Sequence, residues 1–449
     1  MTALLWLHYN RRFSKMLCLR NQIFINILDA EKFQCIFLCT LPNLCYTSII
    51  QMLSGRVGMA ITVRDLLKLP YFEPVTVVAG QAGLDRAVTA AGILDYEYAE
   101  GYTMKEQVFR KNDLLVSSLL FAKDAPQNLL NMLQDLIDLG ATGLAYKSVL
   151  IDTLPDEVLR LADEHDFPIL KFGMNLYLEE FVFQIMDNVK LERQLAEKEE
   201  LLDALIAENL PKEELNQAAK RIDSSLGHYL YSVYISGKKR MEYHDFERLY
   251  RGPTGVKQID DSVTVCCYRN GYFLLFPGEA AEEKQYLDLF RNVAAYLDLG
   301  ADKCWLGCST LVRCPEGFSS GIQQAYFASI CAQARRQHSQ NYSDMGVYQF
   351  LIPNLRSPHL LDYMRQFLSP LLEGRSDNND ELLSTAIAYI SEEGDIGNTA
   401  ERLYCHKNTV RYRLNKLHER LCPSSSDSAF YEQLSIAVKI YLLCHLDRI

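Results

Sequence analysis

The chain has 449 residues, of which 49% are hydrophobic and 23% charged, a composition that indicates a folded globular protein of roughly two to four domains. Its net charge of -11 argues against a protein that binds nucleic acid or a membrane surface with its whole surface, so any contact with DNA must be local. The thirteen cysteines are an odd number scattered through apolar runs, which predicts reduced thiols in a cytoplasmic protein.

Two groups of cysteines are candidates for a metal site. Neither group has paired C-x-x-C spacing, and no cluster of histidines accompanies them, so we predict no metal and no other cofactor. The groups are Cys35, Cys39 and Cys45, and Cys304, Cys308 and Cys314.

Residues 1–58 form a hydrophobic extension without a clear pattern. Charged residues and Pro42 interrupt its apolar runs, so neither a membrane span nor a signal peptide fits. The character changes at Met59, and we expect that the native protein begins there. An intact mass of the natural protein that includes residues 1–58 would contradict this.

Residues 59–175 alternate short apolar strands with amphipathic helices, which predicts an α/β domain. The expected strands lie at 75–78, 114–116, 144–146 and 169–170, and the expected helices at 127–139 and 155–165.

The same region carries polar residues that could suggest catalysis. They show no nucleophile–base pattern, and Gly80 and Gly83 lack a phosphate-binding fingerprint and indicate a turn. These polar residues are Asp95, Glu97, Asp113, Asp152 and His165.

Residues 176–226 are predicted to form a helical connector, because 176–210 is charged and free of glycine and proline. A 4-3-4-3 spacing along it could form the seam of a parallel dimer, and the alternative is a helix that lies on its own domain. The seam positions are Leu191, Leu195, Lys198, Leu202 and Leu205.

Residues 227–352 mix strands and helices. Asn270-Gly271 between two apolar runs predicts a hairpin of strands 263–268 and 272–276. Further strands are expected at 229–235 and 304–309, and helices at 282–299 and 319–336. Residues 353–380 are expected to be a linker with a helix at 356–368.

Residues 381–449 are predicted to form a helix-turn-helix domain. A first apolar stripe ends at Gly394, Asp395 is a candidate N-cap, and a short helix follows through Ala400 and Leu403. After Tyr404-Cys405-His406, a third helix repeats apolar residues on one face. That face carries Val410, Leu414, Leu417 and Leu421.

The other faces of this third helix are basic, in a chain that is acidic overall. Arginine and lysine neutralise phosphates, and arginine and asparagine can bind guanine and adenine edges in the major groove. The alternative is a solvated cationic face on an ordinary helical bundle. The predicted DNA-binding residues are His406, Lys407, Asn408, Thr409, Arg411, Tyr412, Arg413 and Lys416.

The run 398–421, NTAERLYCHKNTVRYRLNKLHERL, resembles the C-terminal domain of PucR/CdaR-type bacterial transcriptional regulators. The resemblance continues into a closing helix with Phe430, Leu434, Val438, Tyr441 and Leu442. Residues 62–95, 112–118 and 161–170 are similar to the N-terminal domain of the PucR group. This similarity implies that the domain binds a small-molecule effector.

The middle region is similar to the GGDEF-like domain of these regulators. Active nucleotide cyclases of the parent fold carry a Gly-Gly-Asp/Glu-Glu-Phe sequence on the hairpin, where carboxylates hold metal ions. Here the turn reads Arg269-Asn270-Gly271-Tyr272, without an acidic residue. The resemblance therefore implies a scaffold rather than a cyclase.

The sequence thus predicts a multidomain α/β and α+β protein: an α/β sensor, a helical connector, a degenerate GGDEF-like α+β domain and an all-α helix-turn-helix domain. The predicted function is a cytoplasmic, ligand-responsive regulator that is not an enzyme and binds a palindromic operator in double-stranded DNA as a homodimer. The family is associated with purine catabolism, sugar-acid use and amino-acid metabolism. The alternatives are a nucleotide-handling enzyme and an adaptor that binds only protein.

Overall fold

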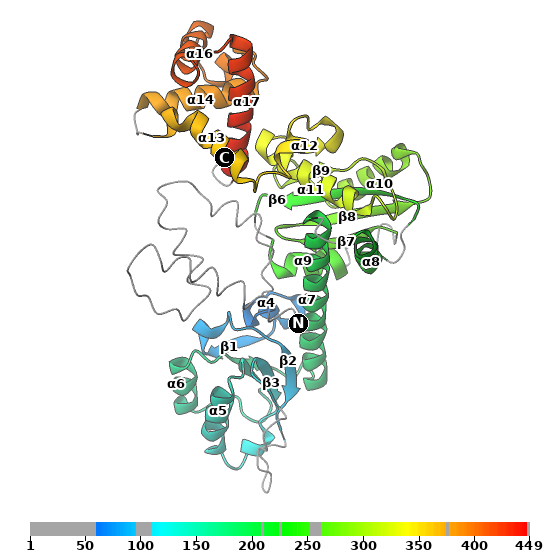
Figure 1. Cartoon of the computed structure of the whole chain (residues 1–449). Helices are drawn as coiled ribbons and strands as arrows, with labels where there is room; N and C mark the ends of the chain where they lie inside the picture. The colour runs from blue at the N-terminus through cyan, green and yellow to red at the C-terminus, as the bar shows by residue number, and fades with distance from the viewer. Residues whose placement is uncertain are drawn as a thin grey trace, which may run out of the picture.

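A computed structural model describes residues 60–95, 109–207, 211–223, 227–239, 241–251, 262–373 and 377–446 (Figure 1). The extension 1–58, with its four cysteines, and Glu97 lie outside the described residues. Figure 1 shows three regions placed end to end, with the long helix α7 (Leu178–Ala207) running from the first region to the second. No helix in the described part of the chain is long and apolar enough to cross a membrane.

The first region is built on a five-stranded sheet, which confirms the expected α/β character. Its strand order is β1-β5-β4-β3-β2, and β2 to β5 are parallel while β1 pairs antiparallel with β5. The strands are β1 (Thr76–Ala79), β2 (Ala90–Ile93), β3 (Asp113–Ser117), β4 (Gly143–Lys147) and β5 (Ile169–Phe172).

Two apolar clusters surround this sheet. One contains residues of α5 (Asn128–Leu139) and α6 (Asp156–Glu164). The other contains residues of α4 (Val63–Leu67) and the N-terminal part of α7. Gly80 begins the turn η2 (Gln81–Gly83) at a φ of 69°, as expected of a glycine turn.

The structure corrects the predicted dimer seam on the connector. Leu191 and Leu195 are buried in the cluster of the first region, and Leu202 and Leu205 are buried in the cluster of the middle region. These leucines contact their own chain and are not available to a parallel partner helix. The alternative, a helix lying on its own domain, is what the structure shows, and α8 (Lys212–Ile222) completes the connector.

The middle region contains a sheet with the path β11-β9-β6-β8-β7, and β10 pairs with β6. The expected hairpin of β7 and β8 is present, and Arg269 takes a φ of 51° in its turn. The strands are β6 (Tyr229–Gly237), β7 (Thr264–Tyr268), β8 (Gly271–Gly278), β9 (Cys304–Cys308), β10 (Val312–Arg313) and β11 (Ser339–Asn341). The helices are α9 (Tyr243–Arg251), α10 (Glu283–Tyr296), α11 (Phe318–Arg335) and α12 (Tyr348–Leu351).

The C-terminal region contains α13 (Pro358–Leu372), α14 (Asp377–Ser391), α15 (Ile396–Arg402), α16 (Lys407–Leu421) and α17 (Asp427–Cys444). The segment 353–380, expected to be a linker, differs from the prediction because α13 packs against α17. Leu361, Met364 and Leu368 supply the apolar face of α13 that is buried in the shared core.

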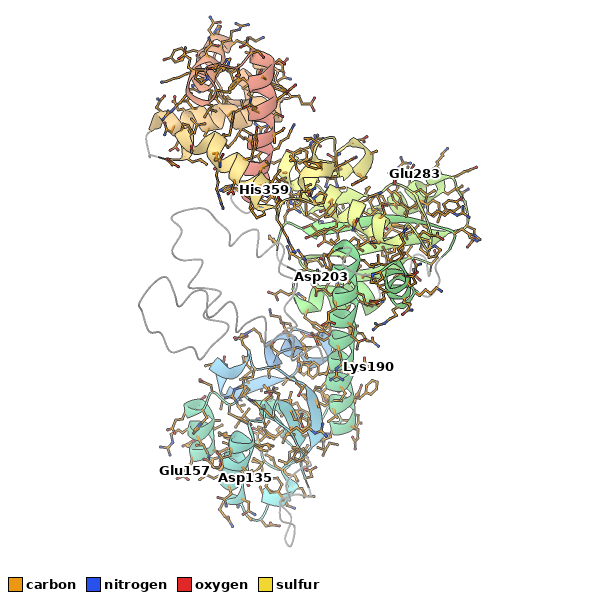
Figure 2. The ribbon with its side chains drawn as sticks, viewed as in Figure 1. Asp135, Glu157, Lys190, Asp203, Glu283 and His359 are labelled. Atoms are coloured by element: carbon orange, nitrogen blue, oxygen red, sulfur yellow. The ribbon has the colours of Figure 1, made fainter. Side chains whose placement is uncertain are left out.

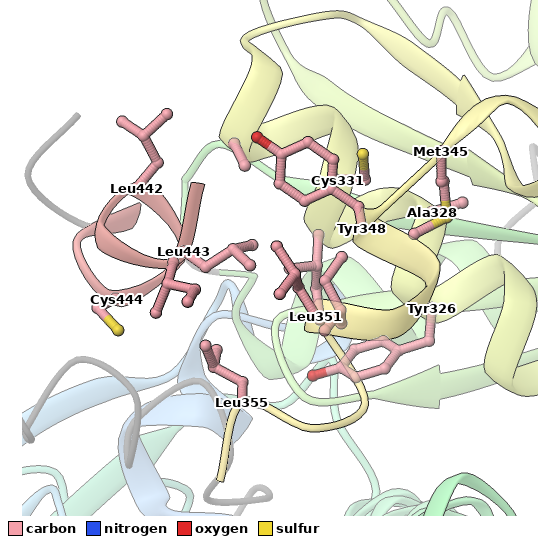
Figure 3. Close-up of a cluster of buried hydrophobic side chains, with 14 of the residues drawn as sticks. Tyr326, Ala328, Cys331, Met345, Tyr348, Leu351, Leu355, Leu442, Leu443 and Cys444 are labelled. Atoms are coloured by element: carbon pink, nitrogen blue, oxygen red, sulfur yellow. The ribbon is translucent and has the colours of Figure 1, made fainter. Parts of the chain in front are cut away.

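An apolar cluster joins the middle and C-terminal regions (Figure 3). Leu442 and Leu443 near the end of α17 belong to the same buried cluster as Tyr348, Leu351 and Leu355. The C-terminal region is therefore packed on the middle region, rather than only attached to it by a flexible chain.

Candidate DNA-binding surface

The first turn of the helix-turn-helix is set by Gly394 and Asp395. Gly394 has a φ of 87°, a left-handed conformation that glycine adopts without strain. The Asp395 carboxylate caps α15 by accepting a hydrogen bond of 2.7 Å from the Asn398 amide. Both residues play the parts that the sequence predicted for them.

The second turn aligns α15 with α16. The Cys405 amide donates to the Ala400 carbonyl at 3.0 Å. His406 is the N-cap of α16, and its Nδ1 accepts from the Asn408 amide at 3.2 Å. Ala400 and Val410 are both buried where the two helices pack, so the small side chain at 400 lets the helices approach.

The two sides of α16 have opposite character. Val410 and Leu417 are fully buried and fix its inner face on the domain. The outer side is exposed and polar, and an exposed helix face of this kind fits the major groove. The exposed residues on it are Lys407, Asn408, Arg411, Tyr412 and Asn415.

Three cations along α16 contact the beginning of α14 instead of pointing freely into solvent. Arg413 Nη2 lies 3.0 Å from Glu381 Oε2, and the Arg413 side chain is only 21% exposed. Lys416 Nζ donates to Asn378 Oδ1 at 3.1 Å, and Arg420 Nη1 donates to Asn379 Oδ1 at 2.7 Å. The predicted basic group therefore divides into an outer set and a set that ties α16 to α14.

Two exposed residues next to this surface were not among the predicted site residues. Tyr404 is 97% exposed in the turn before α16, where its φ is 52°. Asn415 follows Arg411 by one helical turn on the same side. A projection of the helix would have found Asn415, whereas the exposure of Tyr404 depends on a backbone conformation that its residue type does not indicate.

The polar residues that the sequence analysis named in the first region make structural contacts. Asp95 Oδ1 accepts hydrogen bonds from both Ser117 Oγ and Ser118 Oγ, at 3.0 and 2.9 Å. Lys171 Nζ lies 2.7 Å from Asp152 Oδ1 and lowers the pKa of that carboxyl. The structure does not bring these groups together as a nucleophile with its base.

In the middle region, the hairpin turn carries a mostly buried arginine. Arg269 Nη2 lies 3.1 Å from Asp203 Oδ1, and Nη1 donates to the Tyr326 hydroxyl at 2.9 Å. The Arg269 amide donates to Glu199 Oε1 at 2.9 Å, so both carboxylates come from α7. This turn binds the connector helix rather than presenting acidic groups to a metal.

The cysteines of the middle region are buried thiols. Burial raises the pKa of Cys304 and of Cys314 to about 11, and it also raises the pKa of Cys308. No group of side chains suited to hold a metal ion occurs among the residues that the structure describes.

Two segments of the chain, one near each end of the described residues, match known protein families. Residues 65–189 match the purine catabolism regulatory protein-like family, and residues 382–440 match the PucR C-terminal helix-turn-helix domain. The chain combines a PucR-family domain with a PucR-type helix-turn-helix domain. The first match covers the sheet of the first region and the start of α7, and the second covers most of α14, all of α15 and α16, and most of α17. The resemblance to PucR-type regulators is thereby confirmed.

One relative of this chain is the purine catabolism regulatory protein of Bacillus subtilis (strain 168). It is 27% identical over 128 residues, which cover 28% of this chain and 23% of the relative's own length. Among solved structures, this chain is similar to the regulator of polyketide synthase expression from Bifidobacterium adolescentis. The match covers 54% of this chain and 96% of that protein's chain. Its sequence identity is 15%, and its TM-score of 0.27 carries no argument about the fold.

Proposed function

We propose that this protein is a cytoplasmic, ligand-responsive transcriptional regulator that binds double-stranded DNA through α16 and is not an enzyme. The observation that carries the proposal is the exposed polar face of α16, held by two capped turns in a helix-turn-helix. The matches to a purine catabolism regulatory protein-like family and to a PucR helix-turn-helix domain support it.

The contacts within the domain suggest separate roles for the predicted residues. Asn408 and Arg411 lie near the start of α16, where a recognition helix meets base edges, and the Arg411 Nη1 bond to Asn408 Oδ1 is 3.1 Å. Lys407 and Thr409 are assigned to phosphates and Tyr412 to the groove wall. Lys416 is also assigned to phosphates, in exchange for its exposed hydrogen bond to Asn378 when DNA is bound. His406 and Arg413 are assigned to the position of α16, because one caps it and the other pairs with Glu381.

The sensor region is proposed to bind a small-molecule effector of a metabolic operon, with purine catabolism as the process that the family name suggests. The effector would favour one arrangement of the regions and so change operator affinity. A homodimer would place two copies of α16 on a palindromic site about 34 Å apart.

The middle region is proposed to be a GGDEF-like scaffold that relays this change without catalysis. The Arg269 turn supports this role, because it holds Glu199 and Asp203 of α7 instead of carrying metal-binding carboxylates. Turnover of a nucleotide with a divalent metal by the full chain would contradict the proposal.

The proposal is tested by fluorescence anisotropy of the full chain with DNA from upstream of its own and neighbouring genes, across a salt series. Affinity should fall steeply with salt, since phosphate contacts release counterions. Arg411→Ala should reduce the preference for specific DNA by about 1–3 kcal/mol, while Lys416→Ala should weaken binding to all sequences alike.

Lys212→Ala is the matched control, because Lys212 is an exposed cation at the start of α8 in the connector. It should leave both affinity and selectivity unchanged. Equal effects of all three substitutions, or no binding even with cell extract added as a source of effector, would contradict the proposed role of α16.

A further inference from the structure

The outer side of α7 beside the sensor sheet carries two large apolar side chains. Phe183 is 63% exposed and Met186 is 41% exposed. On the same face of the helix, Glu179 lies one turn before Phe183 and Lys190 lies one turn after Met186, and both are exposed. We call these four residues the outer stripe. Figure 2 labels Lys190, the last of the four, on α7.

The spacing of the outer stripe is 4-3-4, which keeps its members on one face of a helix. None of its members is one of the leucines that the chain buries, so it is a separate stripe from the seam predicted from the sequence. The Ala91 amide of the edge strand β2 lies 3.2 Å from Met186 Sδ, and Ile93 on the same strand is 38% exposed. The apolar part of the stripe therefore extends onto the edge of the sheet.

The outer stripe is complementary to itself. A two-fold axis that crosses α7 between Gln184 and Ile185 relates position 179 to 190 and position 183 to 186. Two copies of α7 crossing antiparallel at this point would place Glu179 against the partner's Lys190 and Phe183 against the partner's Met186. The symmetry makes each contact occur twice, as in an isologous interface.

We propose that the outer stripe is the surface through which a second copy of this chain docks, with the two α7 helices antiparallel. A parallel arrangement would oppose Glu179 to the partner's Glu179 and Lys190 to the partner's Lys190, and like charges in contact disfavour that pairing. Within the described residues neither Glu179 nor Lys190 forms a salt bridge, so both charges are available to a partner. The inference rests on the proposed homodimer and assigns its interface.

The test measures the mass of the full chain by light scattering and by sedimentation over a range of concentrations. The wild type should have twice the chain mass of 51.4 kDa. Glu179→Lys and Lys190→Glu should each raise the dimer Kd about tenfold or more, since each turns two surface ion pairs into repulsions. The double variant Glu179→Lys with Lys190→Glu should restore the wild-type Kd, which a general loss of folding would not do.

Phe183→Glu should give a monomer that keeps the wild-type circular dichroism, because the side chain is mostly exposed in the single chain. Glu197→Lys is the matched control: Glu197 is exposed on the same helix beyond the overlap, so its reversal should leave the Kd unchanged.

A dimer that survives Phe183→Glu, or a charge swap that restores nothing, would overturn this interface while leaving a DNA-binding homodimer in place. A wild-type chain that stays monomeric at every concentration and on DNA would overturn both the interface and the proposed dimer. Loss of DNA binding alone, with the dimer intact, would contradict the proposed function and not this inference.

Discussion

At the scale of single residues, Gly394 shows how one backbone conformation positions the whole helix-turn-helix. Its φ of 87° is accessible to glycine, and a Cβ at this position would lie 3.0 Å from Tyr431 Cε2. Gly394→Ala should therefore lower the free energy of unfolding by about 1 kcal/mol or more.

Urea denaturation followed by circular dichroism measures this change. Gly173→Ala is the matched control, because a Cβ at Gly173 meets nothing within 4 Å. Similar stabilities for the Gly394 and Gly173 variants would show that the turn tolerates a side chain and that its geometry does not depend on glycine.

Arg269 is a second residue with a specific structural task. Its guanidinium pairs with Asp203 and lies over the rings of Tyr268 and Tyr326, with 4.9 and 5.5 Å to their centroids. Arg269→Ala should lower the free energy of unfolding by about 2 kcal/mol, because it removes a mostly buried cation with its ion pair and ring contacts.

The comparison is Arg291→Ala, which removes an exposed ion pair with Asp288 on α10. That variant should lose less than about 0.5 kcal/mol, as is usual for surface pairs. If the two urea midpoints shift equally, then the hairpin turn does not hold α7 as described.

The sequence allowed several of these residues to be predicted, since capping and glycine turns are local. The roles of Gly394, Asp395 and the β7–β8 hairpin followed from residue type and spacing. The contacts of Arg413 with Glu381 and of Arg269 with α7 could not be predicted, because they join residues far apart in the chain.

At the scale of elements, α7 shows the limit of reading a periodic pattern. A 4-3-4-3 leucine spacing is satisfied equally by a partner helix and by the chain's own domains. The sequence correctly predicted the helix, but only the fold shows that the sensor and middle regions already cover its leucines. Strand β2 was missed for another reason, since Ala90-Ala91-Gly92-Ile93 has little β-branched character.

Helix α17 carries a lysine at its contact with the middle region. Lys439 Nζ lies 5.9 Å from the centroid of the Tyr348 ring, and Arg335 lies over the same ring at 5.3 Å. Burial, and then the charge of Arg335, lower the pKa of Lys439. The two like charges meet where α17 docks, so this contact is held mainly by the apolar cluster around it (Figure 3).

This lysine makes stability depend on pH. A lysine whose pKa is lower in the folded chain leaves the unfolded chain with more bound protons between the two pKa values. Below the pKa of the folded chain, the charged lysine therefore lowers the free energy of unfolding. This destabilisation disappears as the pH rises from that pKa toward the ordinary value of 10.5.

Lys439→Met should raise the free energy of unfolding at pH 7, and the difference from wild type should shrink as the pH approaches 10.5. Urea unfolding at a series of pH values measures both quantities, and the difference cancels the titration of the tyrosines and cysteines shared by the two proteins. A variant that is less stable than wild type at pH 7 would show that the ammonium stabilises the docked state.

At the scale of the whole molecule, the described regions form a continuous packed path. The apolar cluster of the sensor region includes Tyr243 and Phe246 of α9, and the cluster of the middle region continues into the core of α13 to α17. Lys68 of the sensor region forms an ion pair with Glu242 just before α9. The first region and α16 are therefore connected through packed elements rather than only through a flexible linker.

A hydroxyl-radical footprint of the full chain on genomic fragments selected for binding tests whether α16 reads an operator. We expect protection of two related half-sites with centres about 10 base pairs apart, since two copies of α16 enter successive major grooves on one side of the duplex. The pattern should disappear with Arg411→Ala. Uniform protection without preferred sequence, or a footprint that Arg411→Ala leaves unchanged, would contradict the claim that this chain reads an operator through α16.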